Sequence, residues 1–395
     1  MIEHTNTPEL RFPEFNEEWN QNKLSDVVNV YDGTHKTPKY TNEGIKFLSV
    51  ENIKTLNSNK YISKKDFIKE FKIHPEYGDV LMTRIGDIGT PNIVNVKEPL
   101  AYYVSLALLK PININSYFLN SLILSPTVQN ELWRKTLHIA FPKKINKNEI
   151  AKVLINYPTF NEQEKIGYFF SKLDRQIELE EQKLAKLEEQ KKGYMQKIFS
   201  QELRFKDENG NQYPEWVTKK LGDIGKVAMN KRIYKNETTE NGEIPFYKIG
   251  NFGKNADTFI TREKFDEYKE KYPYPNVGDI LISASGSIGR TIEYTGEDAY
   301  YQDSNIVWLN HNDEVINKYL KYFYKIVKWS GIEGTTIKRL YNKNILNTKI
   351  ELPRVEEQYK MANFLSKLDK IIDIQIEKIE LLKQRKQGLL QKMFV

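Results

Sequence analysis

The chain contains the stretch EQEKIGYFFSKLDRQIELEEQKLAKLEEQKKGYMQKIF (162–199) and repeats it as EQYKMANFLSKLDKIIDIQIEKIELLKQRKQGLLQKMF (357–394). From 161/356 to 199/394, 16 of the 39 aligned pairs are identical, at a constant offset of 195 residues. Two more segments recur in the same order: LRFPEFNEEW (10–19) returns as LRFKDENGNQYPEW (203–216), and GDVLMTRIGDIG (78–89) returns as GDILISASGSIG (278–289). A period this long indicates a duplicated domain with its own helix rather than a solenoid of short repeats.

Both long stretches carry apolar residues at heptad spacing, which is typical of a coiled coil. The central apolar positions are Leu173, Ile177, Leu184 and Leu187 in the first copy and Leu368, Ile372, Ile379 and Leu382 in the second. Polar residues interrupt both patterns at equivalent places, which are Glu180 and Lys191 in the first copy and Gln375 and Lys386 in the second. We expect these residues to form a helix pair that also docks partners.

The polar interruptions predict an antiparallel pair with a defined register, because polar core residues favour the arrangement in which they meet one another. Placing Glu180 opposite Lys386 brings every polar interruption against a polar partner. The same register pairs Leu187 with Ile379, Leu184 with Leu382, and Lys191 with Gln375. The repeat then predicts a pseudo-twofold axis across the middle of the pair. The alternative is that both helices simply pack on other domains.

The sequence predicts an α+β protein of two tandem α/β domains separated by the two long helices. The expected parts are a first domain at 1–160, a helix at 161–202, a second domain at 203–354 and a helix at 355–395. Strands are expected at 45–50, 79–85, 155–158, 244–249, 279–285 and 350–353, and shorter helices at 117–136 and 317–331. The segments 28–77 and 228–277 share little sequence with each other. We therefore expect the similar ends of the two copies to serve one common function and the dissimilar middle parts to serve two different functions. Drift after duplication is the alternative.

Composition excludes several classes of protein. The 395 residues include no cysteine, and the five histidines lack metal-ligand spacing, so disulfide scaffolds and thiolate zinc sites are excluded. No apolar run of membrane-spanning length and no secretory signal are present, so we expect a cytoplasmic protein with no membrane contact. No Walker, H-E-x-x-H or G-x-S-x-G motif occurs, and NYPTF (156–160) departs from the motif of amino-methyltransferases. A binding role is therefore favoured over catalysis.

The positive charge is concentrated in two places. The net charge of +7 divides into +3, −1, +3 and +2 over residues 1–160, 161–202, 203–354 and 355–395. Residues 134–152 hold six basic side chains and one acidic one, and residues 318–349 hold eight and one. Both stretches mix cations with Asn, Thr and aromatic residues, as DNA contacts require. The candidates are Lys143, Lys144 and Lys147, then Lys338, Arg339 and Lys343. A solvated basic loop is the alternative for either copy alone.

Weaker candidates lie in two early loops and in the Gly-Asp segments. The early loops contribute Lys36 and Lys39, then Lys231, Arg232 and Lys235, and the Gly-Asp segments contribute Arg84, then Ser285 and Arg290. The glycines at 86, 89, 286 and 289 could cradle a phosphate, but no G-x-x-x-x-G-K-[ST] or G-x-G-x-x-G pattern occurs. Tight turns are the better interpretation of these glycines.

The duplicated layout resembles the specificity subunit of type I restriction–modification systems. The resemblance is carried by the openings that end at Trp19 and Trp216, by the GD-x-L and G-x-IG segments at 78–89 and 278–289, and by the helix starts at 158–174 and 353–369. It covers nearly the whole chain. It implies that each variable region is a target recognition domain for one half of a bipartite double-stranded DNA site. It also implies that the long helices act as conserved spacers that dock two modification subunits.

The resemblance further implies that restriction subunits complete the assembly. Methyl transfer with S-adenosylmethionine and ATP- and Mg²⁺-dependent cleavage would reside in those partners, with no cofactor in this chain. Such a complex acts in the bacterial cytoplasm and is nucleoid-associated when on DNA. Two alternatives remain from the residues alone: a stand-alone nuclease acting on DNA, or a coiled-coil adaptor with no nucleic-acid role.

Overall fold

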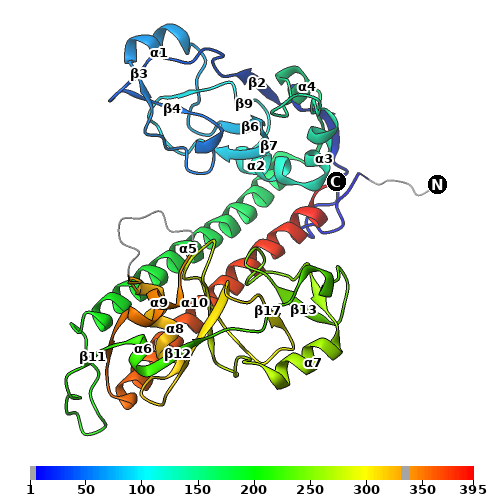
Figure 1. The fold of residues 1–395 in the computed structure, drawn as a ribbon. Helices are drawn as coiled ribbons and strands as arrows, with labels where there is room; N and C mark the ends of the chain where they lie inside the picture. The colour runs from blue at the N-terminus through cyan, green and yellow to red at the C-terminus, as the bar shows by residue number, and fades with distance from the viewer. Residues whose placement is uncertain (1–5, 331–338) are drawn as a thin grey trace. The chain divides into compact units, whose positions relative to one another are not determined.

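A computed structural model describes residues 6–330 and 339–395 (Figure 1). The chain divides into two compact units. Unit 1 comprises Met1–Lys183 and Gln375–Val395, and unit 2 comprises Leu184–Ile374. Two long helices, α5 (Phe160–Phe199) and α10 (Val355–Met393), each contribute one part to each unit.

Unit 1 combines short strands with helices. Its strands are β1 (Asn20–Lys23), β2 (Val28–Asp32), β3 (Tyr40–Thr41), β4 (Ile45–Leu48), β5 (Tyr61–Ile62), β6 (Val80–Ile85), β7 (Asp87–Ile93), β8 (Leu100–Tyr102), β9 (Leu106–Pro111) and β10 (Leu154–Tyr157). Its shorter helices are α1 (Lys64–Glu70), α2 (Ser116–Leu124), α3 (Pro126–Arg134) and α4 (Lys147–Ala151), with 3₁₀ turns at Leu24–Asp26 and Val50–Asn52. The strands form sheets in the orders β2-β9-β6-β7, β3-β5-β4-β8 and β1-β10.

Unit 2 repeats this plan with different strand lengths. Its strands are β11 (Val217–Lys220), β12 (Gly225–Ala228), β13 (Ile244–Tyr247), β14 (Phe259–Ile260), β15 (Ile280–Ser283), β16 (Thr291–Glu293), β17 (Tyr300–Tyr301), β18 (Ile306–His311) and β19 (Lys349–Leu352). Its shorter helices are α6 (Leu221–Ile224), α7 (Arg262–Lys271), α8 (Asn317–Ile326) and α9 (Asn342–Asn347), with a 3₁₀ turn at Lys235–Glu237. The sheet orders are β12-β18-β15-β16, β14-β13-β17 and β11-β19. The prediction of two tandem mixed α/β domains is confirmed.

The repeated Gly-Asp pair starts a hairpin in each unit. Gly78 and Gly278 have φ values of 92° and 93°, a left-handed conformation that favours glycine. The Asp79 carboxylate accepts a hydrogen bond from the Glu76 amide at 2.8 Å, and the Asp279 carboxylate accepts one from the Asn276 amide at 2.8 Å. These bonds close the turn before β6 and β15, so the motif is explained by backbone geometry.

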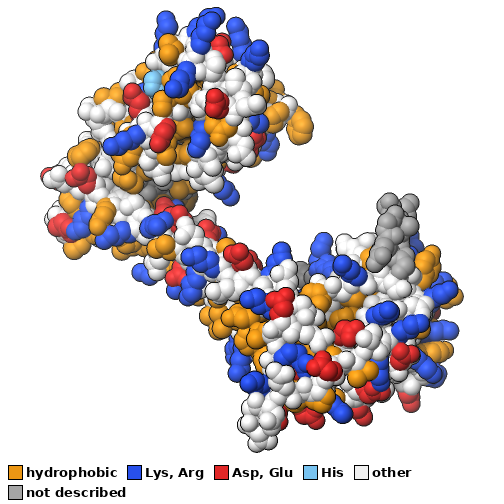
Figure 2. Space-filling model, turned by 90° about the vertical axis from the view of Figure 1, so that its left-hand side faces the viewer, with side chains coloured by type: hydrophobic (Ala, Val, Ile, Leu, Met, Phe, Trp, Pro, Cys, Tyr) orange, Lys and Arg blue, Asp and Glu red, His pale blue; other side chains and the backbone are white. Residues whose placement is uncertain are grey.

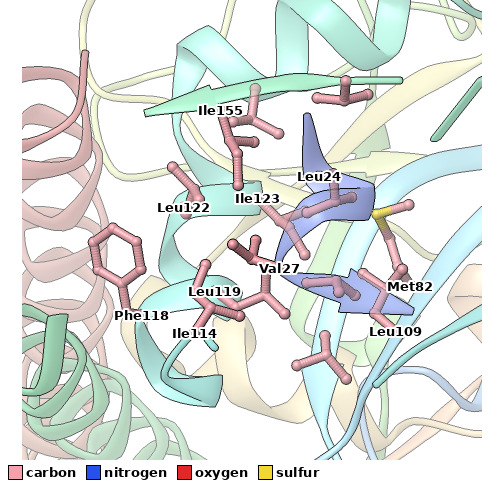
Figure 3. Close-up of a cluster of buried hydrophobic side chains, with 14 of the residues drawn as sticks. Leu24, Val27, Met82, Leu109, Ile114, Phe118, Leu119, Leu122, Ile123 and Ile155 are labelled. Atoms are coloured by element: carbon pink, nitrogen blue, oxygen red, sulfur yellow. The ribbon is translucent and has the colours of Figure 1, made fainter. Parts of the chain in front are cut away.

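The core of unit 1 forms where α2, β10 and the 3₁₀ turn after β1 cover the sheet that contains β6 and β9 (Figure 3). Leu24, Val27, Phe118 and Leu122 are buried in this cluster. Phe394, directly after α10, belongs to the same cluster and packs edge-on against Trp19, with ring centroids 6.1 Å apart. The end of α10 is therefore built into the core of unit 1.

The expected helix at 117–136 is two helices. Ser125 has extended φ and ψ angles, and its hydroxyl accepts a hydrogen bond from the Val128 amide as the N-cap of α3. Pro126 then occupies the first turn, where its missing N–H costs nothing. The helical periodicity continues through this break, which is why the pattern alone predicted one element.

The Glu-Gln pair at the start of each long helix ties it to its own unit. Gln163 accepts a hydrogen bond from the Asn115 amide at 2.9 Å and donates one to the Pro158 carbonyl at 2.9 Å. Gln358 makes the equivalent bonds to Ile316 and Pro353, both at 3.0 Å. The repeated helix starts therefore fix the long helices to the domains.

The long helices pair antiparallel within each unit, as predicted. In unit 1, the Lys386 ammonium bonds Asp174 near the N-terminal end of α5, and the Glu180 carboxylate accepts hydrogen bonds from Gln375, at 2.7 Å, and from Lys378. In unit 2, Lys191 bonds Asp369. Residues that lie late in one helix therefore meet residues that lie early in the other.

The predicted register is wrong. The sequence places Glu180 opposite Lys386, but its partners Gln375 and Lys378 lie 11 and 8 residues earlier in α10. Lys191 was expected opposite Gln375 and instead bonds Asp369. The interrupting lysines reach carboxylates from the SKLD motif, whose acids lie outside the heptad core positions. Heptad core positions alone therefore do not identify these partners.

Candidate nucleic-acid interface

Three segments of unit 1 that are distant in sequence meet at the end of the β6–β7 hairpin. Ile85 forms an antiparallel bridge with Lys144, and the Gly86 amide donates to the Lys143 carbonyl at 2.8 Å. Asp32, at the end of β2, bonds the side chain of Arg84 in β6. The end of β2, the hairpin and the basic loop 137–144 are therefore held together.

The buried side chain of Arg84 connects these segments through hydrogen bonds. Its side chain is only 4% exposed, and its Nε donates to the Ile145 carbonyl at 2.9 Å while Nη1 bonds Asp32. A guanidinium group satisfied in this way is not free for a phosphate. The expectation that Arg84 contacts DNA is corrected: the residue positions the basic loop, because a strand residue in the GDVLMTRIGDIG hairpin faces inward here.

The equivalent segments meet in unit 2. Ser285 forms an antiparallel bridge with Arg339, and the Leu340 amide donates to the Ala284 carbonyl at 2.6 Å. The Ser285 hydroxyl donates to Asn305 at 2.9 Å, and Arg339 donates to the Ser304 carbonyl at 3.2 Å. The hairpin segment, the basic segment and the turn at 303–305 are therefore brought together.

The early loop of unit 2 reaches the same place through Arg232. Its Nε lies 2.9 Å from the Asp303 carboxylate, on the turn that Arg339 also contacts. Lys231 lies next to it, with its ammonium 5.1 Å from the centroid of the Tyr272 ring. Three of the predicted segments of unit 2 are thus adjacent, whereas the contacts in unit 1 join the hairpin and the basic loop to the end of β2.

The remaining predicted residues lie mainly at exposed positions. Lys36, Lys39, Lys143, Lys144, Lys147, Lys231, Lys235, Arg290 and Lys343 are exposed. Arg290 has a long contact of 3.4 Å with the Gly253 carbonyl, away from the turn at 303–305. Lys338 lies outside the described residues. The glycines at 86, 89, 286 and 289 all have positive φ, as tight turns require.

The charge on the face drawn in Figure 2 is dispersed. On that face, Lys and Arg side chains are scattered among hydrophobic and acidic ones in both units. Several cations are paired: Arg232 with Asp303, Lys264 with Glu237 at 2.6 Å, and Arg134 with Glu131 at 3.2 Å. Lys143 and Lys144 appear in no such pair within the described residues, and neither do the exposed Lys36, Lys39 and Lys147, so these lysines are available to meet phosphates.

Sequence reasoning missed two features of these surfaces. The apolar residues Ile139 and Phe141 stand fully exposed at the tip of the basic loop, and only their position beside Lys143 and Lys144 could have indicated them. Asp303 and Asn305 organise the unit 2 surface through hydrogen bonds, and the sequence carries no signal for that role. Both features depend on contacts between distant segments.

Residues 6–330 and 339–395 contain no cluster of three or more His, Cys, Asp or Glu side chains placed to hold a metal ion. Within the same ranges, no helix combines the length and the apolar character needed to cross a bilayer.

Comparison with known proteins identifies both copies of the repeat. The profile of the type I restriction modification DNA specificity domain matches residues 16–189 and 213–384. A putative type I restriction enzyme specificity subunit of Haemophilus influenzae is 58% identical over 151 residues, which are 38% of this chain and 39% of that protein. The putative MjaX specificity subunit of Methanocaldococcus jannaschii is 24% identical over 406 aligned positions, covering 95% of this chain and 93% of that protein.

Solved structures share the fold. The S subunit of the type I restriction–modification system of M. genitalium superposes with a TM-score of 0.59 at 17% identity, covering 98% of this chain and 99% of that one. A chain from a study of assembly and conformational transition of the type I system gives a TM-score of 0.56 at 16% identity, covering 94% and 96%. The comparisons do not favour a nuclease or an adaptor without DNA.

Proposed function

The chain belongs to the type I restriction modification DNA specificity domain family, and we propose that units 1 and 2 each read one half of a bipartite DNA target. As a specificity subunit, the chain is the non-catalytic, DNA-recognising member of a type I system. The observation that supports the two half-sites is the convergence described above. In each unit the hairpin segment bonds the basic segment, and it lies next to the end of β2 in unit 1 and next to the turn that the early loop contacts in unit 2.

The two surfaces differ in the residues that base reading would use. In unit 1 the exposed donors are Lys143 and Lys144 beside the apolar loop tip. In unit 2, Ser285 and Asn305 bond each other, and Arg339 is partly exposed. Because hydrogen-bond donors and acceptors at base edges differ between base pairs, unlike surfaces select unlike half-sites.

The long helices would serve the second part of the function. Each unit carries the same Glu-Gln and SKLD contacts with its own parts of α5 and α10. Because these contacts occur once in each unit, each unit presents a similar helical surface. We therefore propose that one modification subunit docks on the long-helix segments of each unit, which makes two in total. Restriction subunits would complete the complex on the chromosome. Methyl transfer from S-adenosylmethionine and ATP-dependent cleavage would take place in those partners.

DNA binding at several salt concentrations tests the role of the surfaces. We expect Lys143→Ala to weaken binding and to lower the slope of log affinity against log salt by about 1, as loss of one phosphate contact should. Arg339→Ala should also weaken binding, through the other half-site. Lys69→Ala, an exposed lysine on α1, is the matched control. Unchanged affinity and an unchanged slope for both test variants would contradict the assignment.

A further inference from the structure

We propose that Ile139 and Phe141 form an apolar wedge that enters a base step of the DNA bound by unit 1. The proposal rests on the proposed function, since it specifies how the unit 1 surface reads its half-site. The starting observation is exposure: Ile139 is 100% exposed and Phe141 is 103% exposed. They are the most exposed large apolar side chains among the described residues. Two uncovered apolar side chains in one short loop call for a partner that covers them.

The base of the loop is anchored, so the tip is held out by the fold. The Leu137 amide donates to the Lys144 carbonyl at 2.8 Å, which closes the loop as a narrow hairpin. The Gly86 amide donates to the Lys143 carbonyl at 2.8 Å, which ties the loop to the β6–β7 hairpin. Arg84 fastens the next residue, Ile145, through its carbonyl.

Trp133, at the end of α3, supports one side of the loop. The His138 ring lies edge-on to the indole with centroids 4.3 Å apart, and its Nε2 is 3.0 Å from the Trp133 carbonyl oxygen. The Lys143 ammonium lies 4.5 Å from the centroid of the same indole ring. The indole therefore contacts both arms of the loop, while Ile139 and Phe141, at its tip, are uncovered.

The charge around the tip selects nucleic acid as the partner. Lys143 and Lys144 are exposed directly after the Phe-Pro pair, and Arg134 and Lys147 are exposed on the flanking helices. The apolar centres of protein–protein interfaces are depleted in lysine. Proteins that kink DNA insert Phe, Leu, Ile, Met or Pro between base pairs while nearby cations hold the phosphates. An apolar tip followed directly by two exposed lysines fits the second description.

A wedge would add specificity at positions without hydrogen-bond readout. Pyrimidine–purine steps such as TA and CA/TG unstack at lower energetic cost than other steps. We therefore expect the half-site read by unit 1 to contain such a step at the position that the wedge enters.

The test uses the full chain in complex with its modification partner and a duplex that carries the methylated site mapped in a host. Each adenine of the half-site is replaced in turn by 2-aminopurine, whose fluorescence rises when it unstacks. The methylated adenine is omitted, because methyltransferases flip their target base. We expect one position to brighten several-fold with the wild-type complex and not with Phe141→Ala. Phe141→Ala should also weaken binding roughly tenfold, the size of one lost aromatic–base contact.

Two further variants make the outcomes distinct. Ile68→Ala removes another exposed apolar side chain, on α1, and should leave both signals unchanged. Phe141→Leu should keep part of the fluorescence change, since leucine also serves as a wedge.

If Phe141→Ala retains full brightening and affinity while Lys143→Ala weakens binding, the wedge is wrong and the DNA-reading role stands. If Phe141→Ala instead releases the modification subunit, the tip is a protein contact and the proposal is overturned. Absence of any sequence-dependent binding by the wild-type complex would refute the proposed function itself.

Discussion

The carboxylate of Glu357, fully buried, accepts two hydrogen bonds from the guanidinium group of Arg204, at 2.9 Å from Nε and 3.0 Å from Nη2. Glu162 and Arg11 make the same two-point contact in unit 1, with both distances 2.7 Å. The hydrogen bonds to these carboxylates raise the pKa of both arginines above the ordinary value. Each pair connects the repeated Leu-Arg-Phe opening to the start of a long helix.

Glu357→Gln should destabilise unit 2 by about 3 kcal/mol, because removing one partner leaves the other charge poorly compensated in a buried site. Chemical denaturation followed by circular dichroism measures the effect. Glu356→Gln, at the exposed neighbouring position, should change the free energy of unfolding by less than about 0.5 kcal/mol. Equal effects of the two substitutions would show that the ion pair does not stabilise the unit.

The helix register can be tested by double-mutant cycles. Asp174→Ala and Lys386→Ala should be coupled by about 0.5 to 1 kcal/mol, since their side chains bond across the helix pair but remain partly open to water. The cycle between Glu180→Ala and Lys386→Ala should give no coupling, because Glu180 bonds Gln375 and Lys378. Coupling in the second cycle and none in the first would restore the register expected from core positions.

Asp369 should make the stability of unit 2 sensitive to acid. Burial opposes its ionisation, but hydrogen bonds from Lys191 and Tyr322 outweigh burial and hold the pKa of Asp369 below its ordinary 3.8. A carboxylate with a lowered pKa stabilises the fold at neutral pH, and that contribution disappears as the pH falls below about 4. Asp369→Asn should therefore cost roughly 1 kcal/mol at pH 7 and progressively less in acid.

The exposed Asp373→Asn, one turn further along α10, is the matched control for this measurement. Thermal unfolding at a series of pH values from 3 to about 7 compares the two variants with the wild type. A difference between Asp369→Asn and wild type that stays constant over this range would contradict the assigned role of the carboxylate.

The length of α5 should set the separation of the half-sites. The helix passes from unit 1 to unit 2 between Lys183 and Leu184. Four residues inserted there add about 6 Å at 1.5 Å per residue, which corresponds to about one to two base pairs of B-DNA. Methylation mapping should find unchanged half-sites with a longer spacer. Methylation of the original spacing by the insertion variant would refute a spacer role for the helix.

The repeat made the two domains, the two long helices and their antiparallel pairing predictable. Heptad periodicity predicts a helix because helix formation depends mainly on residues that are close in sequence, and the duplicated motifs predict that the domain occurs twice. The register was not predictable in the same way, since Lys191 and Lys386 find Asp369 and Asp174 outside the core positions. A lysine side chain is long enough to reach a carboxylate outside the heptad core. Matching polar residues at core positions therefore does not predict which residue the lysine bonds.

The candidate surfaces were predictable as segments and not as individual contacts. The basic stretches were recognised because they recur at equivalent places, and the hairpin does bring Lys144 to Ile85 and Arg339 to Ser285. The inward orientation of Arg84 depends on Asp32, a residue about fifty positions earlier whose role the sequence does not mark. The exposure of Phe141 depends on hydrogen bonds at the base of its loop.

The most direct test of the account is methylation mapping by single-molecule sequencing of a host that carries this chain with its modification partner. The account predicts methylated adenines in one motif with two specified halves, separated by a constant number of unspecified base pairs. Replacing the variable part of unit 1 with that of a relative should then change one half and leave the other half unchanged. An uninterrupted motif, or a change in both halves after that replacement, would contradict the claim that each unit reads its own half-site.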